Sequence, residues 1–384
     1  MIRAVIIYGV FMFDNFIVPK NLIPSDPRFG VGPSLIPVEA LEALAKTGPN
    51  LLGTSHRKMP VRNLVKEVQN GLRTYFKLPD DYEVILGNGG ATFFWDMIGL
   101  GLVQKSSLHF VCGEFSDKWY RAHYNIPWIQ AKAIKVPFGE GINPVEAGEH
   151  DLICCTLNET STGVQLSNIP QLNNPQTLMA VDATSGAGQI KVDFKNIDIY
   201  YFSPQKVFAS DGGLYIAIMS PKAVARAEHI QKDKSRFIPE SLKFSHAIEN
   251  GRNNQTYNTP SVANIFLLNE QIKLMNKLGE EKVILEAKRK AELMYGWAEE
   301  KPYLSPYIKN PEFRSQAVIT VDVDPKYNLG DLTRILRQQN VAVDIDGYRK
   351  LDRNQFRIAL FHNVTYDNLK KLTQIISLAI ESLG

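Results

Sequence analysis

The sequence TLMAVD at residues 177–182 and the sequence IDIYYFSPQK at residues 197–206 decide the fold. Each begins with a short apolar run that is typical of a buried strand, and each run leads to one chemically active residue, Asp182 or Lys206. Similar runs recur between residues 82 and 218, with helix-like stretches between them. This alternation predicts an α/β fold with a mostly parallel sheet that helices cover on both faces.

Ligands of such sheets bind at the carboxyl ends of the strands, which is where Asp182 and Lys206 fall. An acid and a lysine at this edge suit pyridoxal 5′-phosphate (PLP). The lysine would hold the aldehyde as an imine, and the acid would keep the pyridine nitrogen protonated. Because a protonated ring draws electrons from a substrate carbanion, both groups are needed. The sequence therefore predicts a PLP site with Asp182 and Lys206 as its catalytic residues.

The bulk composition limits the classes of partner that the chain is expected to bind. The 384 residues carry a formal net charge of only +3, which predicts neither a nucleic-acid surface nor a basic membrane patch. No stretch is long and apolar enough for a membrane helix, so we expect no membrane partner. The three cysteines, Cys112, Cys154 and Cys155, form no Cys-x-x-Cys pair. They are predicted to be small core residues of a protein in the reducing cytoplasm.

The chain divides into three expected segments. Residues 1–20 contain an apolar run that is too short to span a bilayer, so we favour an upstream extension, or a start codon assigned too early, over a targeting signal. Residues 21–280 form the expected large PLP-binding domain, and residues 281–384 a small α+β domain entered through a bridging helix at 282–299. The small domain is predicted to contain strands at 317–323, 341–345 and 355–361, a helix at 329–338 and a final amphipathic helix capped by Thr365.

Three motifs suggest contacts to a ligand that has a planar ring and a phosphate group. Residues 87–92, GNGGAT, lie between a predicted strand and a predicted helix, where glycines and a helix N-terminus can hold a phosphate. A strand-to-helix turn also uses glycines for tightness alone, and that alternative stays open. Phe115 can stack on a ring or pack in the core, and Thr160 can bond a ring oxygen or belong to an ordinary polar turn. The seven histidines show no metal-binding spacing, so no metal site is predicted.

Two groups of cations suggest anionic substrates. His56, Arg57 and Lys58 are consecutive, which favours a dianionic partner, although a solvated basic turn is the alternative. Arg349 precedes the last predicted strand of the small domain, and Arg357 lies inside it. Since a buried arginine needs an anion, Arg357 is expected to bind either a substrate carboxylate or a structural acid.

Taken together, these motifs resemble the class-V family of PLP-dependent aminotransferases of fold type I, and within it the phosphoserine aminotransferases in their actinobacterial form. The similarity runs from about residue 28 to the C-terminus. The stretches that carry it are residues 53–57, 87–96, 158–160, 181–182, 203–206 and 257–260. The resemblance implies a large domain with a mostly parallel seven-stranded sheet, a small α+β domain, and a homodimer with shared active sites.

The resemblance also implies roles for individual residues. Lys206 and Asp182 would hold the cofactor as described above, and Lys206 would also move the proton between Cα and C4′. Further cofactor contacts would come from Ala91, Thr92, Phe115, Thr160 and Gln205, and from Asn258 and Thr259 of the other subunit. Substrate contacts would come from Arg357 for the α-carboxylate, and from His56, Arg57 and Arg349 for the distal group. The chain departs from the family pattern in having Phe115 where many members have Trp, and Tyr348 where others have His.

The implied reaction converts O-phospho-L-serine and 2-oxoglutarate to 3-phosphohydroxypyruvate and L-glutamate, a step of L-serine biosynthesis. Some relatives also act on a phosphohydroxythreonine in pyridoxine biosynthesis, and the sequence leaves that second activity open. One alternative is another fold type I enzyme such as alanine–glyoxylate aminotransferase. A cysteine desulfurase is disfavoured because no cysteine follows Cys155. From another class, a non-catalytic α/β protein could bind a nucleotide or sugar phosphate at residues 87–92.

Overall fold

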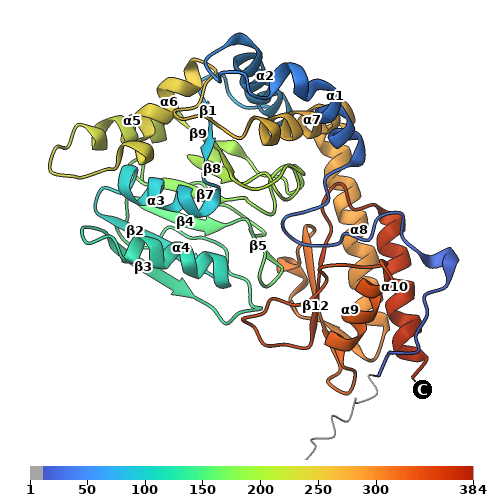
Figure 1. Ribbon diagram of the computed structural model, residues 1–384. Helices are drawn as coiled ribbons and strands as arrows, with labels where there is room; N and C mark the ends of the chain where they lie inside the picture. Colours follow the sequence, from blue (N-terminus) through green and yellow to red (C-terminus); the bar gives the residue numbers. More distant parts are fainter. Residues whose placement is uncertain (1–11, 384) are drawn as a thin grey trace, which may run out of the picture.

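The computed structural model describes residues 12–383 and centres on a mixed sheet of seven strands (Figure 1). The strands follow the spatial order β1-β9-β8-β7-β4-β2-β3, and only β9 runs antiparallel to its neighbours. The predicted mostly parallel α/β sheet is therefore confirmed. The strand bounds are β1 Glu83–Asn88, β2 Ser106–Val111, β3 Gln130–Lys135, β4 Leu152–Thr156, β7 Leu178–Asp182, β8 Ile199–Phe202 and β9 Leu214–Met219. A short hairpin, β5 Asn158–Glu159 with β6 Val164–Gln165, follows β4.

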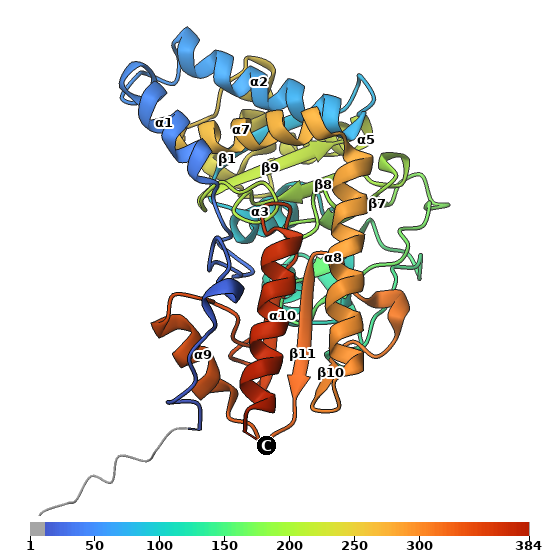
Figure 2. The ribbon, with the colours of Figure 1, turned by 90° about the vertical axis from the view of Figure 1, so that its right-hand side faces the viewer.

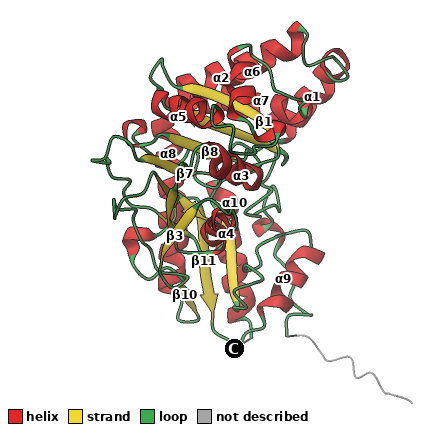
Figure 3. Cartoon of the chain, turned by 90° about the vertical axis from the view of Figure 1, so that its left-hand side faces the viewer, coloured by secondary structure: helices red, strands yellow, loops and turns green. Residues whose placement is uncertain are grey.

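Helices cover both faces of this sheet (Figure 3), and all its strands except the edge strand β3 are mostly buried, which explains why they are continuous apolar runs. Successive side chains of a strand point to opposite faces, so Ala180 and Tyr201 join one core while Val181 and Tyr200 join the other. The first core is closed by α3 Ala91–Gly101, α4 Glu114–Tyr124, α5 Pro221–Gln231 and α6 Phe244–Arg252. The second contains α2 Met59–Phe76 and α7 Val262–Leu278, and α1 Val38–Leu51 packs beside α7.

A long helix, α8 Glu280–Glu300, leads into the C-terminal unit (Figure 2). This unit is an antiparallel sheet with α8 and α10 packed together on it, and the predicted cap of the last helix is present, because Thr365 Oγ1 accepts the N–H of Asn368 at 3.2 Å. Its remaining elements are β10 Leu304–Pro306, β11 Val318–Val323, α9 Leu329–Gln338, β12 Gln355–Ala359 and α10 Tyr366–Glu381.

The strand predicted at residues 341–345 is wrong. Within the part of the chain that the structure describes, this segment makes only an isolated bridge between Val343 and Arg28. Asp344 has φ +58°, a left-handed conformation that interrupts an extended strand. The resulting loop turns its next residues toward the sheet edge of the large unit, where they line a cavity described below.

The first described residues pack against the C-terminal unit. Phe13 is buried and its N–H donates to Asp331 Oδ2 at 2.9 Å, and Phe29 O accepts the N–H of Ala359 at 2.9 Å. Of the extension expected over residues 1–20, residues 1–11 lie outside the described residues. The contacts of residues 13–29 favour assigning them to the small unit, so we propose that the large domain begins after residue 29 rather than at residue 21.

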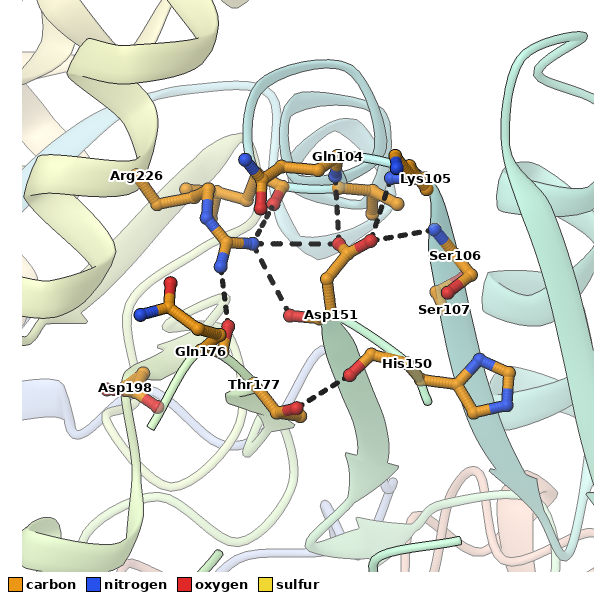
Figure 4. Close-up of polar contacts among 12 residues, drawn as sticks. Gln104, Lys105, Ser106, Ser107, His150, Asp151, Gln176, Thr177, Asp198 and Arg226 are labelled. Atoms are coloured by element: carbon orange, nitrogen blue, oxygen red, sulfur yellow. Dashed lines mark hydrogen bonds and ion pairs between the residues drawn. The ribbon is translucent and has the colours of Figure 1, made fainter. Parts of the chain in front are cut away.

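One partly buried carboxylate joins the amino ends of two parallel strands (Figure 4). Asp151, which precedes β4, accepts the backbone N–H groups of Gln104, Lys105 and Ser106 at 2.7–2.8 Å. Arg226 of α5 lies 3.6 Å from the same carboxylate. This anchor sets β4 beside β2 at the sheet edge opposite the strands' carboxyl ends, which leaves those ends free to form a site.

Two predictions about chemistry away from the site can be compared with the fold. Cys112, Cys154 and Cys155 are free and buried, and burial raises the pKa of each thiol, as expected for inert core residues. Across residues 12–383, every helix is either too short or too polar to cross a membrane.

Candidate active site

Two adjoining cavities open at the carboxyl ends of β4, β7 and β8. The first has a volume of about 300 Å³ and the second about 540 Å³. They share five lining residues, which are Gly32, Pro33, Phe115, Thr160 and Lys206. The first is further lined by Gly89, Gly90, Ala91, Thr92, Trp95, Thr156, Asn158, Asp182, Thr184, Ser203, Gln205 and Gly213. The structure thus brings together all seven cofactor contacts that the sequence predicted within this part of the chain, from Ala91 to Lys206.

Lys206 is buried where the two cavities meet. Its side chain is 8% exposed, and Nζ donates to Val31 O at 2.7 Å. A Cβ on Gly32 would lie 2.5 Å from Nζ, and Gly32 has φ +142°, so only glycine suits this position. Burial, and then the charge of Arg357, lower the pKa of Lys206 to about 7. A large fraction of this amine is therefore neutral and nucleophilic near neutral pH.

Asp182 is the buried acid of the first cavity. It ends β7 with 4% exposure, and its Oδ1 accepts the N–H of Thr184 at 3.0 Å. Its Oδ2 accepts the indole N–H of Trp95 at 3.1 Å. Burial raises the pKa of Asp182 even though these hydrogen bonds lower it. A buried carboxylate in this state is stabilised by any cation that enters the cavity, such as a protonated ring nitrogen.

The predicted phosphate site at residues 87–92, the phosphate cup, lies at the N-terminus of α3. Gly90, the residue before the helix, has φ +84°, a conformation that favours glycine. Ala91 and Thr92 form the first turn of α3 and line the cavity, where first-turn N–H groups lack partners within the helix. These groups and the positive end of the helix dipole fit a phosphate.

Phe115 is held at the cavity by the start of α4. The buried carboxylate of Glu159 accepts the N–H of Phe115 at 3.2 Å and that of Ser116 at 2.9 Å. The ring centroid of Phe115 lies 5.9 Å from Lys206 Nζ. Its place agrees with the predicted stacking on a planar ligand, and Glu159 fixes that place.

Several buried polar atoms at the first cavity fit a polar, planar ligand. Within residues 12–383, Thr156 Oγ1, Thr184 Oγ1 and Gln205 Oε1 are buried without a hydrogen-bond partner. Buried polar groups normally have partners, so each is available to a ligand. Thr160 Oγ1 instead donates to Ser185 Oγ at 2.8 Å, and as an acceptor it can still bind a ring hydroxyl. With the acid, the lysine and the helix N-terminus, these atoms fit PLP.

The second cavity is rich in cations. Arg357 of β12 is half-buried and donates through Nη1 to Thr160 O at 3.2 Å, while its Nε is buried and has no partner among the described residues. Burial lowers the pKa of Arg357 to about 10. The exposed Arg349 lines the same cavity, as does Tyr348, whose ring centroid lies 5.1 Å from the Arg357 guanidinium carbon. Such a cavity fits an acid with a carboxylate at Arg357.

Arg357 should influence the protonation of Lys206. Because the positive charge of Arg357 disfavours the ammonium form, the substitution Arg357→Gln should raise the pKa of Lys206 above about 7. In the cofactor-free protein, the rate at which Lys206 reacts with a small aldehyde should then reach half its maximum at higher pH. The rate is measured across pH by trapping with borohydride and quantifying the modified Lys206 peptide.

The matched control is Arg349→Gln, which removes an exposed cation of the same cavity. Solvent screens an exposed charge, so its midpoint should move less. If Arg357→Gln leaves the midpoint in place, burial alone sets the state of this amine.

The other four predicted residues come together elsewhere in the chain. Thr259 Oγ1 lies 3.2 Å from His56 Nδ1, and Arg57 donates to the carbonyl oxygen of Tyr257 at 2.9 Å. Asn258 lies beside them, within reach of Asn88 Nδ2 at 3.3 Å. His56, Arg57, Asn258 and Thr259 are absent from the lining of both cavities. They form one basic cluster, but not at the Lys206 of their own chain.

The structure also shows site residues that the sequence did not single out. Trp95 lies one helical turn after Ala91, so the helical period could have pointed to it. Lys118 lies one turn after Phe115 and lines the second cavity. Thr156 and Thr184 reach the first cavity from β4 and from the turn after β7, and no local sequence signal marks them.

One buried group of three residues combines side chains from β2, α4 and β4. His109, His123 and Cys154 place their possible metal-ligand atoms within 4.8 Å of one another. His109 Nε2 lies 3.1 Å from His123 Nδ1, and the indole N–H of Trp119 donates to His123 Nε2 at 3.1 Å. These contacts describe a polar network inside the core, and the expectation of no bound metal stays a prediction.

Comparison with known proteins shows which family this chain is similar to. Residues 122–351 match the family described as Aminotransferase class-V. A phosphoserine aminotransferase of Rhodococcus opacus is 42% identical over 96% of this chain and 99% of its own length. The crystal structure of a phosphoserine aminotransferase from Cytophaga hutchinsonii has a TM-score of 0.85 at 26% identity, covering 94% of this chain and 100% of its own. A PLP-bound phosphoserine aminotransferase from Trichomonas vaginalis shares the fold, with a TM-score of 0.79, 19% identity and coverage of 92% and 99%.

Proposed function

This chain belongs to the phosphoserine aminotransferases of the class-V aminotransferase family, and we propose that it transfers an amino group between O-phospho-L-serine and 2-oxoglutarate with PLP as its cofactor. The products are 3-phosphohydroxypyruvate and L-glutamate, and the reaction is a step of L-serine biosynthesis. The observation that carries the proposal is one cavity lined by both a buried lysine of lowered pKa and a buried acid.

The residues of the first cavity fit the two ends of PLP. When bound, PLP supplies an aldehyde that condenses with amines and a protonated ring that withdraws electrons from the reacting carbon. Lys206 would hold the aldehyde end, and Asp182 would face the ring nitrogen and keep it protonated. Ala91 and Thr92 would bind the phosphate through backbone N–H groups, while Phe115, Thr160 and Gln205 line the remaining surface.

As a free amine beside the bound substrate, Lys206 would be a suitable proton carrier. Its pKa of about 7 lets Nζ take a proton from the substrate Cα and return it later at neutral pH. Burial of the amine and of Asp182 limits the access of water to the reacting carbon.

The second cavity offers the substrate contacts. The unpartnered Nε of Arg357 is available to the α-carboxylate that all four substrates and products share. The distal group is a dianionic phosphate in one substrate pair and a carboxylate in the other, so one site must accept both acids in turn, as in ping-pong kinetics. Arg349 and Lys118 offer positive charge from the same chain.

We further propose a homodimer in which the basic cluster of one subunit completes the site of the other. The structure supports this because His56 contacts Thr259 and Arg57 contacts Tyr257, the neighbour of Asn258, while none of the four cluster residues lines either of the two cavities of its own chain. A second copy would bring Asn258 and Thr259 to the cofactor phosphate and His56 and Arg57 to the distal phosphate of the substrate.

The substitution Arg57→Ala should weaken the binding of phosphohydroxypyruvate more than the binding of glutamate. A charge-assisted hydrogen bond to a dianion contributes about 1.5–3 kcal/mol, and the carboxylate of glutamate carries less charge. Steady-state kinetics should therefore show a larger fall of kcat/KM for phosphohydroxypyruvate than for glutamate. Equal losses would remove Arg57 from the distal site.

Mixed dimers test which subunit supplies Arg57. A dimer of one Lys206→Ala subunit and one Arg57→Ala subunit, isolated with two different affinity tags, should contain one complete site if the cluster acts across the interface. Its activity should then approach half that of the unmodified dimer. If Arg57 serves its own chain, the mixed dimer has no complete site and gains nothing over the parents.

The proposed activity is tested directly by incubating the purified chain with PLP, glutamate and phosphohydroxypyruvate and measuring 2-oxoglutarate. Alanine with glyoxylate is the matched alternative pair, and formation of pyruvate from it alone would favour the alanine–glyoxylate reading. Because the relatives are phosphoserine aminotransferases, that reading and the non-catalytic phosphate-binding protein are not favoured. We place the enzyme in the cytoplasm, and its use of phosphohydroxythreonine in pyridoxine biosynthesis can be measured in the same assay.

A further inference from the structure

We infer that Trp95 is a positioning residue for the cofactor, because its indole N–H fixes one oxygen of Asp182 and its helix also forms the phosphate site. The inference rests on the proposed function and deepens it. It assigns to Trp95 a role that acts through Asp182, whose carboxylate would face the ring nitrogen.

The contact itself is short and buried. Trp95 Nε1 donates to Asp182 Oδ2 at 3.1 Å, and Trp95 is 4% exposed. The backbone N–H of Thr184 takes the other oxygen at 3.0 Å. With the indole N–H on one oxygen and the backbone N–H of Thr184 on the other, the carboxylate plane is set from two sides, by α3 and by the turn after β7. The remaining lone pairs of the carboxylate are available to the cavity that both residues line.

The position of Trp95 along α3 couples the two ends of the ligand site. Ala91 and Thr92 begin the helix, and Trp95 follows Ala91 by one turn on the same side of the helix. All three line the first cavity. A site built on one rigid helix holds its parts more accurately than a site on a loop. The spacing between the phosphate cup and Asp182 is thus set by a single helical turn and one hydrogen bond.

The backbone of Trp95 packs against a residue of α4. Its carbonyl oxygen lies 3.2 Å from Nε2 of His123, a buried residue of α4. The same helix begins beside Phe115, which lines the cavity. The helix that presents the indole therefore packs beside the helix that presents the stacking ring.

The charge state of Asp182 depends on groups from several elements. Asp182 interacts electrostatically with three of them, Cys155 of β4, Tyr201 of β8 and Lys206 after β8. Burial raises the pKa of Asp182, and the hydrogen bonds from the backbone N–H of Thr184 and the indole N–H of Trp95 lower it. Loss of the indole N–H removes one bond that favours the carboxylate, so the pKa of Asp182 should rise further. A neutral carboxyl cannot balance a protonated ring nitrogen, and cofactor affinity should fall.

The test begins with the substitution Trp95→Phe in the full-length chain. Equilibrium dialysis of the cofactor-free protein against PLP should show an affinity about tenfold lower or more, since a hydrogen bond to a charged group is lost. The matched control is Trp297→Phe. Trp297 is also buried, and its indole N–H donates to Ser377 Oγ at 2.9 Å in the small unit. This control should leave PLP affinity unchanged.

A second variant separates the hydrogen bond from packing. Site-specific replacement of Trp95 by 3-benzothienylalanine keeps the bicyclic shape and exchanges only the N–H for sulfur. It should lower PLP affinity as Trp95→Phe does, and it should raise the pKa of Asp182 in the cofactor-free protein, measured by ¹³C NMR of labelled aspartate carboxyls and assigned with Asp182→Asn. An affinity and a pKa equal to those of the unmodified protein would overturn the inference.

A double-variant comparison shows whether Trp95 acts through Asp182. In the Asp182→Asn background, Trp95→Phe should cause little further loss of PLP affinity, because the interaction has already been weakened. Full additivity of the two losses would contradict a positioning role. If the unmodified chain fails to bind PLP at all, the proposed function fails. If the unmodified chain binds PLP and needs Asp182, while Trp95→Phe behaves like Trp297→Phe, this inference fails alone.

Discussion

The substitution Lys206→Ala should abolish both turnover and the visible absorbance of lysine-bound PLP. Lys206 is the lysine that lines both cavities, and its pKa of about 7 suits covalent attachment and proton transfer. Acid–base catalysis by one positioned group contributes about 10²–10⁴-fold, and loss of the attachment point adds to this. We therefore expect kcat to fall by about 10³-fold or more, measured with glutamate and phosphohydroxypyruvate.

A second buried lysine provides the control. Lys290 of α8 is 1% exposed and donates to the carbonyl oxygens of Phe361 and His362, and burial lowers its pKa to about 8. It lies outside both cavities, so Lys290→Ala should lower stability but keep the absorbance of the bound cofactor. Full activity of Lys206→Ala would end the aminotransferase account.

The substitution Asp182→Asn should cause the second largest loss, at the other end of the same ligand. The amide keeps the shape of the side chain but carries no charge to balance a protonated ring nitrogen. Breaking a buried charge pair costs about 3–5 kcal/mol, which corresponds to a loss of at least about 10²-fold. We expect this loss to be divided between PLP affinity, measured by dialysis, and kcat.

Asp198→Asn is the matched change at another buried acid. Asp198 is 8% exposed, accepts the N–H of Met179 at 3.0 Å and pairs with Lys222 at 2.9 Å, away from both cavities. Its replacement should affect stability while PLP affinity is retained. Equal PLP affinity in Asp182→Asn and the unmodified protein would show that this carboxylate does not face the cofactor.

The fold and the centre of the site could be predicted because they depend on short-range patterns. Buried strands are apolar runs, and parallel strands deliver the residues after their carboxyl ends to one edge, so Asp182 and Lys206 could be paired from spacing alone. The phosphate cup followed from glycines before a helix. The strand predicted at 341–345 failed because its apolar residues are buried in the hydrophobic core from a loop, in which Asp344 takes a left-handed conformation.

Contacts between distant segments could not be predicted from the sequence. No local pattern shows that the indole of Trp95 reaches from α3 to the end of β7, or that Lys118 of α4 faces the loop after α9. The basic cluster is a different case. The sequence predicted that His56 and Arg57 bind an anion, but it could not show that they lie with Asn258 and Thr259 and away from Lys206 of their own chain.

The attachment of PLP to one amine can be measured directly. The purified chain is loaded with PLP, reduced with borohydride to make the link permanent, digested and analysed by mass spectrometry, with Lys206→Ala as the parallel sample. The account predicts that the peptide containing Lys206 carries the reduced cofactor, and that the parallel sample carries none on any peptide of the site. Modification of a different lysine at the same stoichiometry, or no modification after loading, would contradict it.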